Sequence, residues 1–156
     1  MKYKFIELYM DWANRAAQLS HAKRLQVGAV IVKDDSVISY GYNGMPAGWD
    51  NNCEIDYYDD TSQWVGNKTK PEVLHAESNA IAKLAKSNNS GLGADLFVTH
   101  SPCLECAKLI FQSGISRVYF GQNYRDDAGV KFLEKSGVTV STPEMREFAK
   151  KQMGIH

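Results

Sequence analysis

Apolar residues recur along this chain with two different periods, and these periods predict where helices and strands form. Near the start, they repeat every three or four positions, which is typical of an amphipathic helix that covers a core: Phe5, Leu8, Tyr9, Trp12, Ala16 and Leu19. Residues 27–32 form a short, continuous and largely β-branched run, and residues 37–40 resume it after a turn at 34–36. Two strand-like runs joined by a tight turn predict a β-hairpin.

Helix-like and strand-like segments alternate through the second half of the chain. Apolar periodicity and stop signals predict helices at residues 74–85, 102–112, 128–135 and 143–152, and strands at residues 96–99, 117–120 and 138–140. This alternation is typical of a mostly parallel sheet with helices on both faces. We therefore expect a single α/β domain over residues 1–156, with three layers (α-β-α) and a mixed, mostly parallel five-stranded sheet.

Residues 41–70 show neither period. They are rich in Gly, Asn and Asp, and they separate the predicted hairpin from the second helix. An irregular segment of this length inside a compact domain is usually functional or mobile. We therefore expect residues 41–70 to be irregular and either functional or mobile.

Composition narrows the class of protein. Lys and Arg together number 18, as do Asp and Glu, so the chain carries no formal net charge. Proteins that follow a nucleic-acid backbone usually have a basic excess, and we therefore expect no nucleic-acid polymer as partner. Three cysteines argue against a disulfide framework and fit a reducing cytoplasm. No apolar run has the length of a signal peptide or a membrane span, so we expect no membrane partner.

Two short segments carry residues suited to metal chemistry: HAE at 75–77 and PCLEC at 102–106. Imidazole nitrogen and cysteine sulfur are ligands that zinc prefers, and a set of three leaves a fourth position for water, as in catalytic sites. Cys103 and Cys106 lie three apart in the first turn of a predicted helix, where the helix N-terminus stabilises thiolate. We therefore expect His75, Cys103 and Cys106 to hold a catalytic zinc ion.

Glu77 is the expected proton carrier of this site. Residues two apart on a helix do not share one face, which favours His75 as the ligand and Glu77 as a carboxylate beside the bound water. Such a carboxylate can take a proton from water, pass it to a ring nitrogen and later protonate a departing amine. Glu105, between the two cysteines, is expected to be a solvated helix residue.

Other interpretations of these residues stay open at this point. A Cys-x-x-Cys pair also occurs in redox-active and structural sites. A structural zinc site would need a fourth ligand, for which Cys53, His21 and His100 are candidates. Cys53 could also join a histidine in a second zinc site, although a buried or loop thiol is the simpler interpretation.

Four segments between about residue 25 and residue 121 resemble the cytidine/deoxycytidylate deaminase superfamily. They are QVGAVIV at 26–32, GYNG with MPAG at 41–48, HAESNAI at 75–81 and VTHSPCLEC at 98–106. The last two carry the superfamily signature, in which His-x-Glu precedes Pro-Cys-x-x-Cys. The GYNG loop followed by Pro-x-Gly resembles the deoxycytidine monophosphate (dCMP) deaminases in particular.

This resemblance implies a fold, a reaction and a set of substrate contacts. The fold would be that of the cytidine deaminases, and the reaction would be zinc-dependent hydrolysis of dCMP to dUMP and ammonia, which supplies dUMP for thymidylate synthesis. By resemblance, Asn43 would contact the sugar and the backbone of Ala76 the pyrimidine edge. Ser101 is a further candidate for substrate binding. The phosphate needs cationic partners, for which we consider Lys23 and Arg24, although a solvated helix end explains these two residues equally well.

The resemblance also implies regulation and assembly. Many dCMP deaminases are hexamers that dCTP, with Mg²⁺, activates and dTTP inhibits, so we expect a homo-hexamer and these two effectors. The implied effector site comprises the first loop and a Tyr-Arg pair: Gly41, Tyr42, Gly44, Tyr124 and Arg125. The alternatives are another zinc nucleobase deaminase, acting on cytidine or editing nucleic acid, and a purely structural zinc module.

Overall fold

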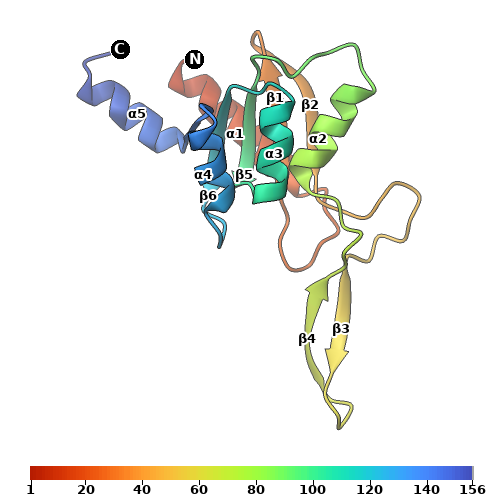
Figure 1. The fold of residues 1–156 in the computed structure, drawn as a ribbon. Coiled ribbons are helices and arrows are strands. Elements are labelled where there is room, and N and C mark those ends of the chain that lie inside the picture. Colours follow the sequence, from red (N-terminus) through yellow and green to blue (C-terminus); the bar gives the residue numbers. More distant parts are fainter. Residues whose placement is uncertain (156) are drawn as a thin grey trace.

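The computed structural model describes residues 1–155 and has a five-stranded sheet at its centre (Figure 1). The strands lie in the order β2-β1-β5-β6-β7. Their bounds are β1 Gly28–Lys33, β2 Ser36–Tyr42, β5 Asp95–His100, β6 Arg117–Gln122 and β7 Thr139–Ser141.

Strand direction confirms the expected mixed sheet. β1 runs antiparallel to both of its neighbours, β2 and β5, whereas β5, β6 and β7 run parallel to one another. Only β1 therefore opposes the other four strands. As a result, β2, β5 and β6 all end at the same edge of the sheet.

Helices cover both faces of the sheet, as the alternation of segments predicted. The helices are α1 Tyr3–Ala17, α2 Ala76–Ala85, α3 Leu104–Gln112, α4 Ala128–Lys135 and α5 Pro143–Gln152. Side chains of β1 alternate between two cores: Ala29 and Ile31 face α2, α3 and α4, whereas Val30 and Val32 face α1. This arrangement gives the three layers that Figure 1 shows.

A second, two-stranded sheet projects from the body, formed by β3 (Glu54–Tyr58) and β4 (Trp64–Thr69) (Figure 1). The expectation that residues 41–70 are irregular throughout was therefore wrong. These strands bury almost no apolar surface, so they lack the alternation that marks a half-buried strand. They are held instead by mutual pairing and by a turn in which the Asp59 carboxylate accepts hydrogen bonds from Thr61 and Gln63.

The chain leading into α2 is extended rather than helical. Leu74 forms an isolated β-bridge with Gly44, and α2 begins only at Ala76. This bridge brings the segment after β2 beside the start of α2. Among the helices of residues 1–155, none has both the length and the apolar content needed to cross a membrane.

Candidate metal centre and its cavity

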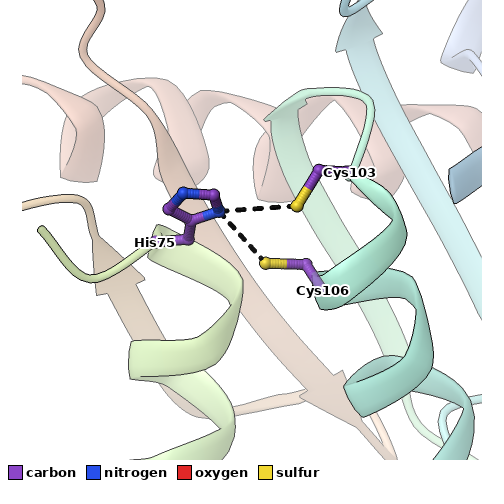
Figure 2. Close-up of side chains that lie close together, drawn as sticks. All are labelled: His75, Cys103 and Cys106. Carbon is purple, nitrogen blue, oxygen red and sulfur yellow. Dashed lines mark hydrogen bonds between the residues drawn. The ribbon is translucent and has the colours of Figure 1, made fainter. Parts of the chain in front are cut away.

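The three predicted ligands come from the starts of two neighbouring helices. His75 has extended backbone and immediately precedes α2, and Cys103 occupies the corresponding position before α3. Cys106 lies in the first turn of α3 and is buried. Figure 2 shows the imidazole pointing toward both sulfur atoms across the gap between the helices. Residues 28 positions apart in sequence thus meet because both helices begin at the same edge of the sheet.

The spacing of these side chains fits a tetrahedral zinc ion. The Sγ atoms of Cys103 and Cys106 lie 3.6 Å and 3.4 Å from the Nδ1 atom of His75. Zinc bonds of about 2.3 Å to sulfur and about 2.0–2.1 Å to nitrogen place tetrahedral ligand atoms about 3.6 Å apart. All three ligand atoms lie within 4.8 Å of one another. The donor set and its separations therefore suit zinc.

The charge state of Cys103 also favours a cation. Hydrogen bonds from the Cys106 thiol and from His75 lower the pKa of Cys103 to about 4. The thiolate is the form of cysteine that binds metal. The hydrogen bond to Cys103, together with burial, raises the pKa of Cys106, and the contact with Cys103 also raises the pKa of His75. A doubly charged ion would relieve this competition for protons.

Glu77 is the second residue of α2, and its carboxyl group is buried, with only 4% of the residue surface exposed. Burial raises the pKa of Glu77 to about 7. A carboxyl group with such a pKa can both accept and donate a proton at neutral pH. Glu105, by contrast, is exposed and forms an ion pair with Lys108 at 3.0 Å, as expected for a solvated residue.

His75, Cys103 and Glu77 line a cavity of about 470 Å³ at the sheet edge where β2, β5 and β6 end. Sites on open α/β sheets commonly lie outside the carboxyl ends of the strands. The wall combines the metal-ligand segments with two arginines and several amide and hydroxyl groups: Arg24, Leu25, Val27, Asn43, Thr69, Val73, His75, Ala76, Glu77, His100, Ser101, Cys103, Gln122, Asn123, Tyr124 and Arg125.

Of the predicted substrate contacts, Asn43, Ala76, Ser101 and Arg24 line this cavity, whereas Lys23 does not. Lys23 and Arg24 lie in the loop between α1 and β1, several residues after α1 ends, so they do not form a helix end. Their backbone N–H groups donate to one carboxylate oxygen of buried Glu54, at 2.7 Å from Lys23 and 3.2 Å from Arg24. The Arg24 guanidinium donates to the backbone carbonyl of Asn67 in β4.

Hydrogen bonds to the backbone hold two polar groups of the cavity in place. The Asn43 side chain accepts from the Val27 N–H and donates to the Leu25 carbonyl, both at 2.8 Å. The Ser101 hydroxyl accepts from the Tyr124 N–H at 2.6 Å. Ser101 is thereby tied to the loop that follows β6, and Asn43 to the entry of β1.

The structure separates the predicted effector residues into two groups. Tyr124 and Arg125 line the same cavity as His75 and Glu77. The other three do not: Gly41 and Tyr42 belong to β2, and Gly44 pairs with Leu74.

Several wall residues escaped sequence reasoning. His100 was considered only as a fourth ligand, and Gln122 and Asn123 were not considered at all, yet all three line the cavity. The sequence could have indicated them, because they lie at the carboxyl ends of two predicted parallel strands, where sites on such sheets commonly form. Burial lowers the pKa of His100, whose Nδ1 atom lies 2.9 Å from the Thr99 hydroxyl.

No fourth ligand for a structural zinc site emerges within residues 1–155. The cluster of His, Cys, Asp or Glu side chains close enough to share an ion comprises His75, Cys103 and Cys106 alone. Cys53 is fully buried and its thiol donates to the Asn51 carbonyl at 3.4 Å, as expected for a structural thiol. The three-ligand set therefore matches the open coordination typical of a catalytic ion.

Comparisons with known proteins agree with this geometry. The chain is 36% identical over 142 residues to ComE operon protein 2 of Bacillus subtilis, covering 90% of this chain and 72% of that protein. It is 38% identical over 120 residues to the deoxycytidylate deaminase of Mycobacterium phage D29, covering 73% of this chain and 91% of the phage protein.

Among solved structures, the dCMP deaminase of cyanophage S-TIM5, in complex with dCMP and dUMP, superimposes with a TM-score of 0.81 and 42% identity. The match covers 91% of this chain and 98% of the cyanophage chain. A family model described as the cytidine and deoxycytidylate deaminase zinc-binding region matches residues 3–122. The chain belongs to the cytidine and deoxycytidylate deaminase zinc-binding family.

Proposed function

We propose that this protein is a zinc-dependent hydrolase that converts dCMP and water to dUMP and ammonia. The observation that carries the proposal is a three-ligand His/Cys/Cys cluster beside a buried glutamate, in a cavity that also contains two arginines. The names of the phage D29 relative and of the S-TIM5 structure support dCMP as the substrate. The product dUMP would supply thymidylate synthesis in the cytoplasm.

His75, Cys103 and Cys106 would hold the zinc ion, and their separations support this assignment. When bound, zinc lowers the pKa of a water molecule and so supplies a nucleophile at neutral pH. Two of the three ligands, His75 and Cys103, line the cavity that would admit the pyrimidine.

Glu77 would move the protons of the reaction. It accepts a proton from the attacking water and delivers it to N3 of the cytosine ring, while the water oxygen bonds to C4. It then takes the second proton of that oxygen and delivers it to the amino group, so that the C4–N4 bond breaks with release of ammonia. Proton delivery is essential because amide ion is a very poor leaving group. The near-neutral pKa of buried Glu77 supports both directions of transfer.

The cavity wall offers a partner for each part of the nucleotide. Asn43 would contact the sugar, the backbone of Ala76 the pyrimidine edge, and Ser101 a further polar atom of the substrate. Arg24 and Arg125 supply positive charge for the phosphate, and the planar guanidinium group suits phosphate oxygens. Lys23, which does not line the cavity, would act only through the backbone hydrogen bond to Glu54.

Arg125→Ala is expected to raise KM for dCMP about 10- to 100-fold, the loss of one charge-assisted hydrogen bond. KM for deoxycytidine, which has no phosphate, should stay near the wild-type value. Steady-state ammonia release with both substrates measures this difference. Arg15→Ala is the matched control, because Arg15 lies exposed on α1 and outside the cavity.

Equal losses for dCMP and deoxycytidine would show that Arg125 does not bind the phosphate. Faster turnover of deoxycytidine than of dCMP by the wild type would contradict the nucleotide substrate itself. A cytosine-containing single-stranded oligonucleotide belongs in the same assay, since efficient turnover there would favour an editing enzyme.

Self-association is a further part of the proposal, with a homo-hexamer as the expected assembly. Two projecting elements support it, because large apolar side chains lie exposed on the β3–β4 hairpin and on α5 with the residues after it. These side chains are Ile55, Tyr57, Tyr58, Trp64, Val65, Met145, Phe148, Met153 and Ile155. Sedimentation velocity would measure the assembly.

Allosteric control by dCTP and dTTP is proposed on the family resemblance. Addition of dCTP with Mg²⁺ is expected to raise the rate at dCMP concentrations well below KM and to leave the rate at saturation almost unchanged, because an activator shifts the population toward a binding-competent state. Initial rates across a dCTP series, with dCTP lacking Mg²⁺ as control, test this. A rate that dCTP leaves unchanged at low dCMP would remove the proposal.

A further inference from the structure

We propose that Gly41 and Gly129 are positioning residues for the metal ligands. Each glycine lies where backbone that carries a ligand rests directly against a neighbouring element, with no room for a side chain. The inference rests on the proposed zinc site, and it assigns Gly41 a role in placing His75 rather than in effector binding.

Gly129 lies in the first turn of α4 and packs against Pro102 and Cys103, which lead into α3. A Cβ atom at this position would lie 2.1 Å from the carbonyl oxygen of Pro102 and 2.8 Å from the carbonyl carbon and oxygen of Cys103. All of these are backbone atoms, which cannot rotate away. Only glycine lets α4 support the Cys103 segment at this distance.

Gly41 performs the equivalent role on the opposite side of the ligand cluster. It lies in β2, and a Cβ atom there would lie 2.3 Å from the Ala76 carbonyl oxygen and 2.7 Å from the Ala80 N–H nitrogen. Both atoms belong to α2, whose first turn follows His75 directly. Neither Gly41 nor Gly129 adopts the left-handed backbone that favours glycine, so the reason for glycine at both positions is space.

A side chain at either position would move a ligand by more than a zinc site tolerates. Restoring an ordinary contact requires a shift of roughly 1 Å, whereas metal–ligand distances hold to about 0.2 Å. The Cys103 segment has little freedom to absorb the shift, because Ser101 just before it donates to the Gln122 carbonyl at 2.8 Å and accepts from the Tyr124 N–H. The displacement would therefore reach the sulfur atom.

Gly28 offers a matched control in the same sheet. A Cβ atom at Gly28 would lie 2.0 Å from the Ala13 carbonyl oxygen and 2.5 Å from the Ala17 nitrogen, so the clash is as severe. Both contacts belong to α1, which covers the face of the sheet opposite the ligand helices. Gly28→Ala should therefore disturb folding without displacing a ligand.

The experiment compares zinc affinity, the absorption spectrum of the Co²⁺-loaded protein and thermal unfolding for wild type, Gly28→Ala, Gly41→Ala and Gly129→Ala. We expect Gly41→Ala and Gly129→Ala to bind zinc at least about 10-fold more weakly, the range for groups that orient metal ligands, and to alter the Co²⁺ spectrum. Gly28→Ala should unfold at lower temperature but bind zinc within about twofold of wild type. Wild-type zinc affinity in both test variants, or an equal loss in Gly28→Ala, would overturn the proposal.

A variant too unstable to purify is tested through refolding. A ligand that binds only the folded state stabilises that state. We therefore expect zinc to raise the refolding yield of the wild type and of Gly28→Ala, and not that of Gly41→Ala or Gly129→Ala. Equal rescue of all three would overturn the proposal. If the wild type itself bound no zinc, the proposed metal site would fail; if it bound zinc and the variants matched it, only the positioning role would fail.

Discussion

Glu77→Gln is expected to lower kcat for dCMP by at least about 10²- to 10⁴-fold while the protein retains its zinc. General acid–base catalysis by one positioned group contributes this much, and Glu77 is the buried carboxyl group that lines the cavity beside the ligands. Glutamine has nearly the same shape but cannot carry the proton. The measurement is single-turnover deamination of dCMP, with metal content determined on the same sample.

Glu105→Gln is the matched control for this substitution. Glu105 lies between the two cysteines in sequence, yet its side chain is exposed. Within residues 1–155, its one ion pair is with Lys108. We expect kcat of the Glu105→Gln variant to stay within about twofold of the wild-type value. Turnover by Glu77→Gln at the rate of Glu105→Gln would contradict the proton-carrier role, and loss of zinc in Glu77→Gln would make Glu77 part of the metal site instead.

Cys106→Ala is expected to remove zinc and activity together. Cys106 is buried and its sulfur lies 3.4 Å from the Nδ1 atom of His75, so no water could replace the thiolate without a large loss of affinity. We expect zinc affinity to fall by more than the roughly 10- to 100-fold that loss of a supporting group costs. Metal analysis after dialysis against a weak chelator measures the effect.

Cys53→Ala controls for the loss of a buried thiol. Cys53 is as buried as Cys106 but lies outside the ligand cluster. Its substitution should lower the unfolding temperature and leave the zinc content unchanged. Equal zinc retention by Cys106→Ala and Cys53→Ala would show that Cys106 is not a ligand.

Local sequence was sufficient to pick out the candidate metal ligands because the two cysteines lie within one helical turn and all three residues stand at helix starts. The three-residue spacing of Cys103 and Cys106 places both sulfur atoms at the start of one helix, and His75 stands at the start of another. The β3–β4 hairpin escaped prediction for the opposite reason. Its strands face solvent on both sides, so no core imposes a pattern on residues such as Tyr58 and Trp64.

The sequence by itself determined the candidate ligand set, the candidate proton carrier and the alternation of strands and helices, since each depends on residue type and short spacing. Only the tertiary structure decided which distant groups share the cavity. Arg125 lines it and Lys23 does not, although both are basic residues in loops. Both loops meet the sheet at the edge where β1 begins and β2, β5 and β6 end, so the packing of the loops decides which of their residues line the cavity. Likewise, the proposed positioning role of Gly41 rests on the close approach of α2 to β2, which only the tertiary structure reveals.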